Sequence, residues 1–241
     1  MTVTSESYHY MADGLSMIGQ LYLPAKLNEP APGILVFPEA LGIGDHSRQW
    51  AERIASELGY AVLACDLFGN GYQCSSIFEA MLKLKSFSES SQRMRAYTYE
   101  TLEAFAKHPQ VDESRIAAIG FCFGGTLSFE LATRGAPLAA AIGFHSRLVL
   151  TPLPEGVQVK ARILALIGAA DPMIPSEQIA SFQSQMNEAG ADWQLHLFGG
   201  VLHSFTNPEA DKRNLPEAQK YDENATRSAW QQMASLLQDV F

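Results

Sequence analysis

The sequence predicts an α/β protein built on a mostly parallel, doubly wound sheet with helices on both faces. Short apolar runs alternate along the chain with segments whose apolar residues recur at helical spacing. Such alternation is typical of parallel strands joined by right-handed helical crossovers. Several runs are apolar throughout, as strands covered on both faces must be. The length of 241 residues suits one domain over residues 1–241 and needs no second domain.

The composition indicates a globular protein and disfavours two classes of partner. Apolar residues make up 47% of the chain and charged residues 18%, which is ordinary for a protein with a sizeable core. The formal net charge is −9 and no basic block occurs, which disfavours binding to nucleic acid or to an anionic membrane. No apolar run approaches the roughly 20 residues that span a bilayer.

Cysteine usage predicts a reducing compartment. The chain has only three cysteines, Cys65, Cys74 and Cys122. A small, odd number of cysteines makes a disulfide framework unlikely. The first residues also lack the basic and apolar regions of a secretory signal. No Cys/His cluster has the spacing of a metal site. We therefore expect a cytoplasmic protein with no metal and no cofactor.

The first half of the chain predicts alternating strands and helices. One helix places Trp50, Ile54 and Leu58 on a single face and stops at Gly59. The expected elements are an antiparallel hairpin over residues 8–23 with a turn at 12–14, a strand over 33–38, a helix from Asp45 or Ser47, and a strand over 60–65.

Residues from about 70 to 95 form the least regular pattern of the chain. Apolar residues at 77–82 suggest a short helix, and a serine-rich piece with scattered basic residues follows through Arg95. The segment is either a cap over the site or an ordinary crossover with a solvated charged face. A helix is predicted over 98–107.

The second half repeats the alternation. The expected elements are strands over residues 116–121, 138–144, 163–168 and 193–198, a helix after Gly125, a helix from Ser176 to Gly190, and a terminal helix carrying Trp230, Met233 and Leu237. In open sheets of this kind ligands bind beyond the carboxyl ends of the strands. Glu39, Cys122, Asp171 and His203 all follow a predicted strand at that edge.

The motif Gly-Phe-Cys-Phe-Gly-Gly at residues 120–125 joins a predicted strand to a predicted helix. This context is typical of a nucleophile elbow, with cysteine in place of the commoner serine. Glycines on both sides allow a sharp bend and close packing. A helix N-terminus next to the thiol favours the thiolate, which is the attacking form. A buried structural cysteine is the alternative interpretation.

The order of the candidate catalytic residues matches nucleophile, acid and histidine. Cys122 comes first, Asp171 follows a strand in a Gly-x-x-Asp-Pro loop, and His203 follows a Gly-Gly loop. A nucleophile needs a base within hydrogen-bond reach, and the base needs a third group that fixes its tautomer. The alternatives are that Asp171 is a turn or capping residue and that His203 is a surface histidine.

Further residues are predicted around this core. The backbone N–H groups of Phe123 and Ala40 are the expected oxyanion donors. Glu39 is either a solvated loop carboxylate or a charge that keeps the Cys122 thiol protonated until substrate arrives. His145 follows the end of a predicted strand. It either lines the substrate pocket or has a purely structural role.

At these residues the chain resembles the dienelactone hydrolase family of α/β-hydrolases, which carry a Cys–His–Asp triad. The resemblance implies Cys122 as nucleophile, His203 as base, Asp171 as orienting acid and Glu39 as the residue that controls the resting thiol. It also implies main-chain oxyanion donors at Ala40 and Phe123. The matching stretches are residues 38–42, 65–69, 120–125, 168–175 and 199–205.

One departure from the family pattern concerns substrate recognition. Family members that cleave dienelactone hold the substrate carboxylate with arginines, one of them four residues after the catalytic histidine, and that position here is Asn207. An asparagine lacks the charged fork that pairs with a carboxylate. Candidates for the second arginine position are Lys83, Lys85, Arg93 and Arg95.

The sequence therefore predicts a hydrolase that cleaves a small ester or lactone through a cysteine acyl-enzyme, with the oligomeric state left open. A phosphotriester is an alternative electrophile, since a thiolate and an oxyanion hole do not dictate carbon chemistry. A hydrolase-shaped binding protein and a thiol redox sensor are rivals from other classes. The sensor needs Cys65 or Cys74 as a resolving thiol for Cys122.

Overall fold

The computed structural model describes residues 1–88 and 90–241, with nothing described for the side chains of residues 86 and 88. The chain forms two compact units, Met1–Ala118 and Ile119–Phe241. The expectation of a single domain over 1–241 stays a prediction. Glu89, which falls within the segment of about 70–95, lies outside the described residues.

The first unit begins with the predicted antiparallel hairpin. Strand β1 (Val3–Ala12) pairs with β2 (Leu15–Pro24) along their whole lengths, so the hairpin is longer than the sequence pattern indicated. The two turn residues, Asp13 and Gly14, have φ values of 51° and 70°. Asp-Gly is favoured there because a two-residue hairpin turn of this type needs positive φ at both positions.

A sheet with strand order β1-β2-β4-β3 continues from the hairpin, and β5 lies next to β3. Strand β4 (Ala61–Ala64) pairs antiparallel with β2 and parallel with β3 (Ala31–Phe37). Helix α1 (Asp45–Leu58) packs against β4 and β2 and buries Trp50 and Ile54. It ends at Gly59 in the left-handed conformation, as predicted.

The segment of about 70–95 is largely helical. Helix α2 (Ile77–Ser88) contacts α3 (Ser91–Ala106), which begins earlier than the predicted 98–107. The serine-rich piece covers the end of α2 and the start of α3. The Ser90 side chain caps α3 by accepting a hydrogen bond from the backbone N–H of Arg93 at 3.2 Å. Helix α2 exposes several large apolar side chains, namely Ile77, Phe78, Met81 and Leu82.

Asp66, at the end of β4, organises the loop that follows it. Its carboxylate is fully buried and accepts hydrogen bonds from the backbone N–H groups of Ile18, Phe68, Gly69 and Gly71 at 2.7–3.1 Å. These bonds satisfy a buried charge that would otherwise be costly. Within the motif at residues 65–69, Asp66 therefore has a structural role in the first unit, where it fixes the loop after β4.

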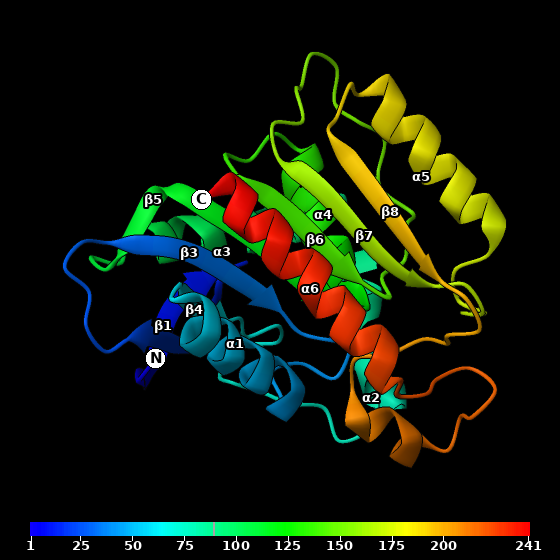
Figure 1. Cartoon of the computed structure of the whole chain (residues 1–241), viewed down its shortest axis with the longest axis horizontal. Helices are drawn as coiled ribbons and strands as arrows, with labels where there is room; N and C mark the ends of the chain where they lie inside the picture. The colour runs from blue at the N-terminus through cyan, green and yellow to red at the C-terminus, as the bar shows by residue number, and fades with distance from the viewer. Residues whose placement is uncertain (89) are drawn as a thin grey trace. The chain divides into compact units, whose positions relative to one another are not determined.

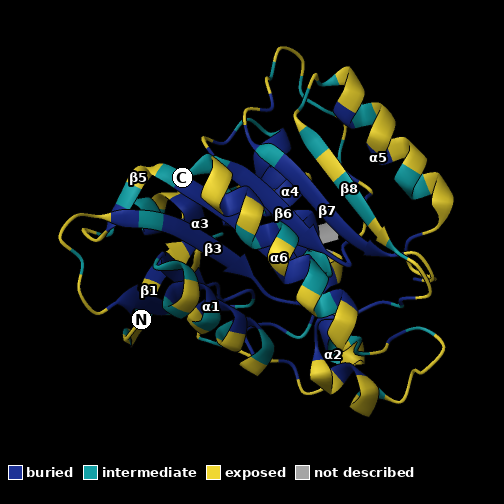
Figure 2. Ribbon diagram, viewed as in Figure 1, coloured by how far each residue is buried: buried dark blue, intermediate teal, exposed yellow. Residues whose placement is uncertain are grey.

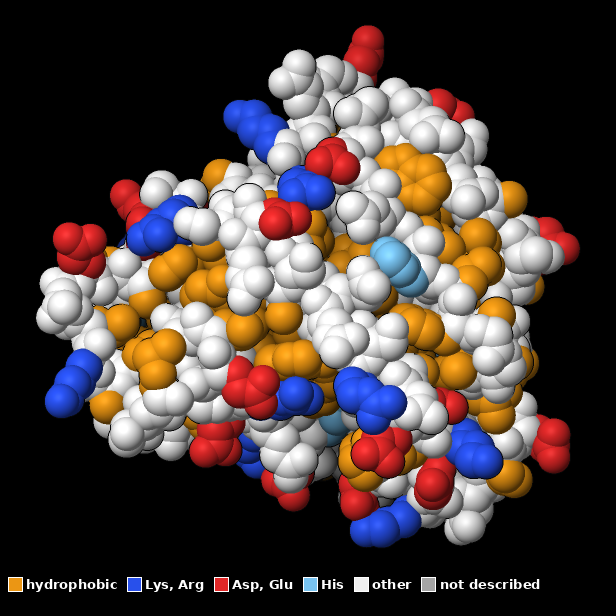
Figure 3. All heavy atoms as spheres, in the orientation of Figure 1, with side chains coloured by type: hydrophobic (Ala, Val, Ile, Leu, Met, Phe, Trp, Pro, Cys, Tyr) orange, Lys and Arg blue, Asp and Glu red, His pale blue; other side chains and the backbone are white. Residues whose placement is uncertain are grey.

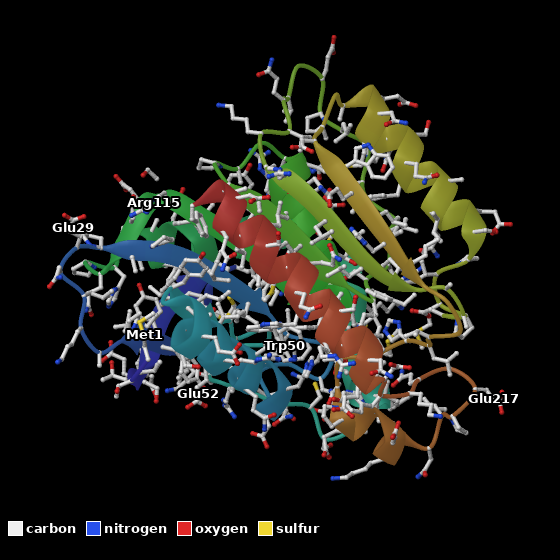
Figure 4. The ribbon with its side chains drawn as sticks, viewed as in Figure 1. Met1, Glu29, Trp50, Glu52, Arg115 and Glu217 are labelled. Atoms are coloured by element: carbon white, nitrogen blue, oxygen red, sulfur yellow. The ribbon has the colours of Figure 1, made fainter. Side chains whose placement is uncertain are left out.

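Strand β5 (Val111–Phe121) starts in the first unit and ends in the second. Arg115, near its outer end (Figure 4), donates from Nε to Asp112 at 2.6 Å. In the second unit β5 lies beside β6 (Ala140–Phe144), which is followed by the parallel strands β7 (Arg162–Gly168) and β8 (Trp193–Phe198). Figure 2 shows β6 and β7 buried, whereas the edge strand β8 is partly exposed.

Helices cover this part of the sheet. Helix α4 (Phe123–Thr133) and helix α6 (Glu223–Val240) both pack against β6, with α6 in front of the strand and α4 behind it in Figure 1. Helix α5 (Ser176–Glu188) places Phe182 5.6 Å from Phe129 of α4, measured between ring centroids. A short 3₁₀ helix, η1 (Pro208–Arg213), precedes the loop to α6.

The surface is mixed in charge. Figure 3 shows Lys and Arg side chains interspersed with Asp and Glu on the displayed face. Among residues 1–88 and 90–241, no helix is long and apolar enough to cross a membrane.

Candidate active site

Cys122 lies at a sharp bend between β5 and α4. Its φ and ψ angles are 53° and −118°, a region that side-chain-bearing residues rarely adopt and that costs about 1–3 kcal/mol. The bend is held by the Cys122 N–H, which donates to the Phe144 carbonyl at 3.0 Å, and by the Cys122 carbonyl, which accepts from the Gly125 N–H at 3.2 Å. The strained conformation and the strand–turn–helix context agree with the predicted nucleophile elbow.

The glycines of the motif are required by close packing. A Cβ atom on Gly120 would lie 2.2 Å from the backbone of Gly124, and a Cβ atom on Gly125 would lie 1.7 Å from Oγ of Ser146. No real Cβ contact is that short, so any larger residue would force the bend apart. The Gly-x-Cys-x-Gly-Gly pattern therefore follows from the shape of the elbow.

Phe123 is the first residue of α4. The first N–H groups of a helix have no acceptor within the helix, and the positive end of the helix dipole lies there. The Cys122 side chain is half-buried next to this helix end. Such surroundings favour negative charge on the sulfur and on an oxygen bound beside it.

Asp171 is fixed in the loop that follows β7. Its backbone N–H donates to the Gly168 carbonyl at 3.2 Å, and its Oδ1 accepts from the backbone N–H of Met173 at 2.8 Å. Its other oxygen, Oδ2, lies 2.6 Å from Nδ1 of His203. Asp171 and His203 are only 4% and 1% exposed, so the pair is shielded from water.

The backbone on both sides of His203 is held by the loop that precedes α6. The His203 N–H donates to the Ala218 carbonyl at 3.1 Å, and the His203 carbonyl accepts from the Lys220 N–H at 3.1 Å. Because a carboxylate only accepts hydrogen bonds, Nδ1 of His203 is the donor to Asp171. This tautomer leaves Nε2 as the atom that can exchange a proton with a nucleophile.

Charges around His203 favour its protonated form. Burial by itself lowers the pKa of His203, but the thiolate of Cys122 and the carboxylate of Asp171 act in the opposite direction. Both the charge of each partner and hydrogen bonding to it raise the pKa, from 6.5 to about 10. The Cys122 and Asp171 side chains therefore both stabilise the protonated form of His203.

Cys122 raises the pKa of His203, and no hydrogen bond of normal geometry joins the two side chains. Within the described part of the chain, Nε2 of His203 has no hydrogen bond of normal geometry, although Cys122 influences the His203 pKa partly through hydrogen bonding. Catalytic hydrogen bonds are often loose without substrate and tighten in the reacting complex.

We expect Cys122→Ala to lower the pKa of His203 from about 10, because the thiolate is the largest of the influences that raise it. The His203 contribution to stability, present below about pH 6.5 and lost as the pH rises toward 10, should shrink with it. NMR titration of the His203 ring protons measures the pKa directly. A Cys74→Ala variant is the matched control, and an unchanged His203 pKa in Cys122→Ala would contradict the coupling.

The two predicted pocket residues lie close to His203 in sequence or in space. His145 is fully buried, and its ring centroid lies 5.1 Å from that of His203. Asn207 is 3% exposed and caps η1, because its Oδ1 accepts from the backbone N–H of Glu209 at 3.0 Å. Their predicted role as pocket residues stays a prediction.

Glu39 and Ala40 belong to the first unit, in the loop after β3. Both are buried, and the Glu39 carbonyl accepts from the Gly42 N–H at 3.0 Å. The role of the Glu39 carboxylate in controlling the thiol and the role of the Ala40 N–H as an oxyanion donor stay predictions.

The basic candidates for carboxylate recognition have partners in the first unit. Nε of Arg93 donates to Asp13 at 2.6 Å, and its guanidinium lies 4.8 Å from the ring centroid of Phe87. Arg95 lies over the Tyr99 ring, and Lys83 lies over the ring of Tyr72. Arg93 is therefore engaged in holding the hairpin turn to α3.

The three cysteines are free thiols. Burial raises the pKa of Cys65 well above its ordinary value of 9.0, and burial likewise raises the pKa of Cys74. Both therefore disfavour the thiolate that a resolving cysteine needs. No group of three or more potential metal ligands occurs in residues 1–88 and 90–241.

Two residues near the candidate site were not predicted from the sequence. Phe144 holds the elbow through its backbone carbonyl, which any residue could supply. Thr206 bonds to His145 through its hydroxyl at 2.8 Å, and a threonine in a polar loop carries no signal of such a contact.

Comparison with known proteins identifies close relatives of this architecture. A sequence profile of the dienelactone hydrolase family matches residues 17–241. The crystal structure of a dienelactone hydrolase-like promiscuous phosphotriesterase from metagenomic libraries is 32% identical, has a TM-score of 0.93 and covers 100% of both chains. A Yersinia pestis protein named "Putative carboxymethylenebutenolidase" is 25% identical over 221 residues, which are 87% of this chain and 79% of the relative.

A more distant structure confirms the fold class. An alpha/beta hydrolase enzyme from a deep-sea metagenome library is 15% identical, with a TM-score of 0.69 and 98% coverage of both chains. The predicted α/β-hydrolase fold is confirmed, with eight strands in a mixed, mostly parallel sheet accompanied by helices.

Proposed function

The chain belongs to the dienelactone hydrolase family and is a dienelactone hydrolase-like hydrolase, and from that premise we propose that it cleaves a small ester or lactone through Cys122. Cys122 is the nucleophile, His203 the general acid and base, and Asp171 the group that orients His203. The buried pair of Asp171 and His203, whose protonation is coupled to Cys122, is the observation that carries this proposal.

In the first half of the reaction the Cys122 thiolate attacks the carbonyl carbon of the substrate. A carbon–sulfur bond forms and the carbonyl electron pair moves onto oxygen, where main-chain N–H groups stabilise the negative charge. The carbon–oxygen bond to the leaving group then breaks. Protonated His203 donates its Nε2 proton to the departing alkoxide, which leaves a thioester on Cys122.

In the second half a water molecule hydrolyses the thioester. Nε2 of neutral His203 takes a proton from water as the oxygen attacks the acyl carbon. Collapse of the tetrahedral intermediate breaks the carbon–sulfur bond, releases the acid and restores the thiolate beside protonated His203. Asp171 holds the imidazole orientation through both halves.

The oxyanion donors are the backbone N–H groups of Phe123 and Ala40, and Glu39 controls the resting thiol. The position of Phe123 at the start of α4 supports its role as an oxyanion donor. The roles proposed for Ala40 and Glu39 rest on the resemblance of residues 38–42 to the family.

A lactone is one substrate class suggested by the relatives, since a Bradyrhizobium protein that is 24% identical over 208 residues is named a probable lactonase. Asn207 stands where carboxylate-binding members have an arginine, and its side chain caps η1. We therefore propose that the substrate is an uncharged ester or lactone. A phosphotriester is a second candidate, because a relative that is 32% identical is a promiscuous phosphotriesterase.

A panel of aryl esters, neutral lactones, anionic lactones and phosphotriesters tests the substrate class. We expect steady turnover of the neutral esters and lactones. For the matching lactones that carry a carboxylate, kcat/KM should be lower by about tenfold or more, because no arginine fork pairs with the carboxylate. A preference for the anionic lactones would contradict the role given to Asn207. A burst of one product equivalent with no further turnover would contradict a hydrolase function altogether.

A further inference from the structure

We propose that His145 is a positioning residue that holds the His203 loop in register with the Cys122 elbow, an inference that rests on the proposed function. His145 follows Phe144 at the carboxyl end of β6. The dipeptide Phe144-His145 contacts both catalytic segments, which are distant in sequence. It therefore forms a direct physical link between the nucleophile and its base.

The backbone of this dipeptide is fixed on both sides. The Phe144 carbonyl accepts the Cys122 N–H at 3.0 Å, and the His145 N–H donates to the Leu166 carbonyl of β7 at 2.8 Å. His145 has a φ of 40°, a conformation that costs free energy for a residue with a side chain. Such a strained backbone conformation persists only where surrounding contacts stabilise it. The conformation of His145 is therefore fixed, and its side-chain contacts show what it positions.

The His145 side chain contacts the loop that carries the proposed base. Its Nε2 lies 2.8 Å from Oγ1 of Thr206, within hydrogen-bond distance. Its ring centroid lies 5.1 Å from that of His203, with an interplanar angle of 66°, and 5.3 Å from that of Phe205, with an angle of 80°. Both are edge-to-face contacts, which favour a defined ring orientation.

The contacts of His145 support positioning rather than substrate contact. Its side chain is 0% exposed, its Nε2 lies 2.8 Å from Oγ1 of Thr206, and its ring packs edge-to-face against His203 and Phe205. A group that touches no substrate can act on kcat only through the residues it orients. A displacement of about 1 Å between reacting groups can cost about 100-fold in rate.

The test compares His145→Phe, Thr206→Val and the double variant with the parent enzyme on an aryl ester. His145→Phe keeps an aromatic ring and removes the bond to Thr206, and Thr206→Val removes the same bond from the other side with little change in shape. We expect each single change to lower kcat by about 10- to 100-fold with KM nearly unchanged. The double variant should be no slower than the slower single variant, because both remove one interaction.

Two further variants separate positioning from general destabilisation. Thr206→Ser keeps the hydroxyl and should retain most of the parental kcat. Thr133→Val is the matched control, since Thr133 is equally buried but its hydroxyl bonds to carbonyls of its own helix, α4, and it should keep the parental kcat. The His203 ring resonances should shift in His145→Phe and Thr206→Val and stay in place in Thr133→Val.

Each contrary outcome has a definite meaning. Parental kcat in folded Thr206→Val, or rate losses that multiply in the double variant, would overturn the positioning role of His145. A changed KM at constant kcat would overturn it in favour of a substrate contact. Parental turnover by Cys122→Ala in the same assay would overturn the proposed function itself, so the two failures are distinguishable.

Discussion

Replacing Cys122 with alanine lowers kcat for an aryl ester by at least about 10⁴-fold, if the sulfur forms the acyl-enzyme. Alanine cannot form the carbon–sulfur bond, and only binding and oxyanion stabilisation would remain. The half-buried thiol contributes little to the core, so the variant should unfold close to the parental temperature near pH 10, where the His203 contribution to stability is lost in both proteins. Steady-state kinetics with a chromogenic ester measure the loss.

Cys74→Ala provides the matched control for this change. Cys74 is also a free thiol, but it is buried in the first unit, and burial raises its pKa. It should retain the parental kcat. A Cys122→Ala variant that matched the parent would remove the sulfur from the mechanism.

Asp171→Asn is expected to lower kcat by about 10³- to 10⁴-fold while leaving the fold intact. An asparagine amide can donate to Nδ1 of His203 and thereby stabilise the tautomer that carries its proton on Nε2. That tautomer cannot accept a proton from the thiol or from water. The pKa of His203 should also fall, because the hydrogen bond and the negative charge of Asp171 both raise it.

The kinetic and pH measurements together identify the cause of the loss. Activity that depends on protonated His203 should decline at a lower pH in Asp171→Asn than in the parent. Asp112→Asn is the control, because Asp112 forms an ion pair with Arg115 and belongs to the first unit. Parental kcat in Asp171→Asn would show that the buried pair has no catalytic role.

The local sequence was sufficient to predict those structural features that depend on a single physical requirement. The Gly120 and Gly125 positions admit no Cβ atom, so the elbow is recognisable from the motif alone. The Asp13-Gly14 turn requires two positive φ angles, and this made the hairpin predictable. The helix stop at Gly59 follows from the same conformational freedom.

Other features could not be located from the local sequence, either because several residues could serve equally well or because the contact joins distant segments. The start of α3 at Ser91 depends on the cap that Ser90 provides in a serine-rich stretch, where several serines are equally plausible caps. The contact of His145 with Thr206 joins two loops that only the folded sheet brings together.

Mass spectrometry of the rapidly quenched enzyme during turnover of an aryl ester tests the central claim most directly. We predict that the acyl group is found on the peptide containing Cys122, as a thioester that forms and decays at rates compatible with kcat. Steady turnover with an acyl group on another residue, or with an unmodified Cys122 throughout a measured burst, would contradict the account.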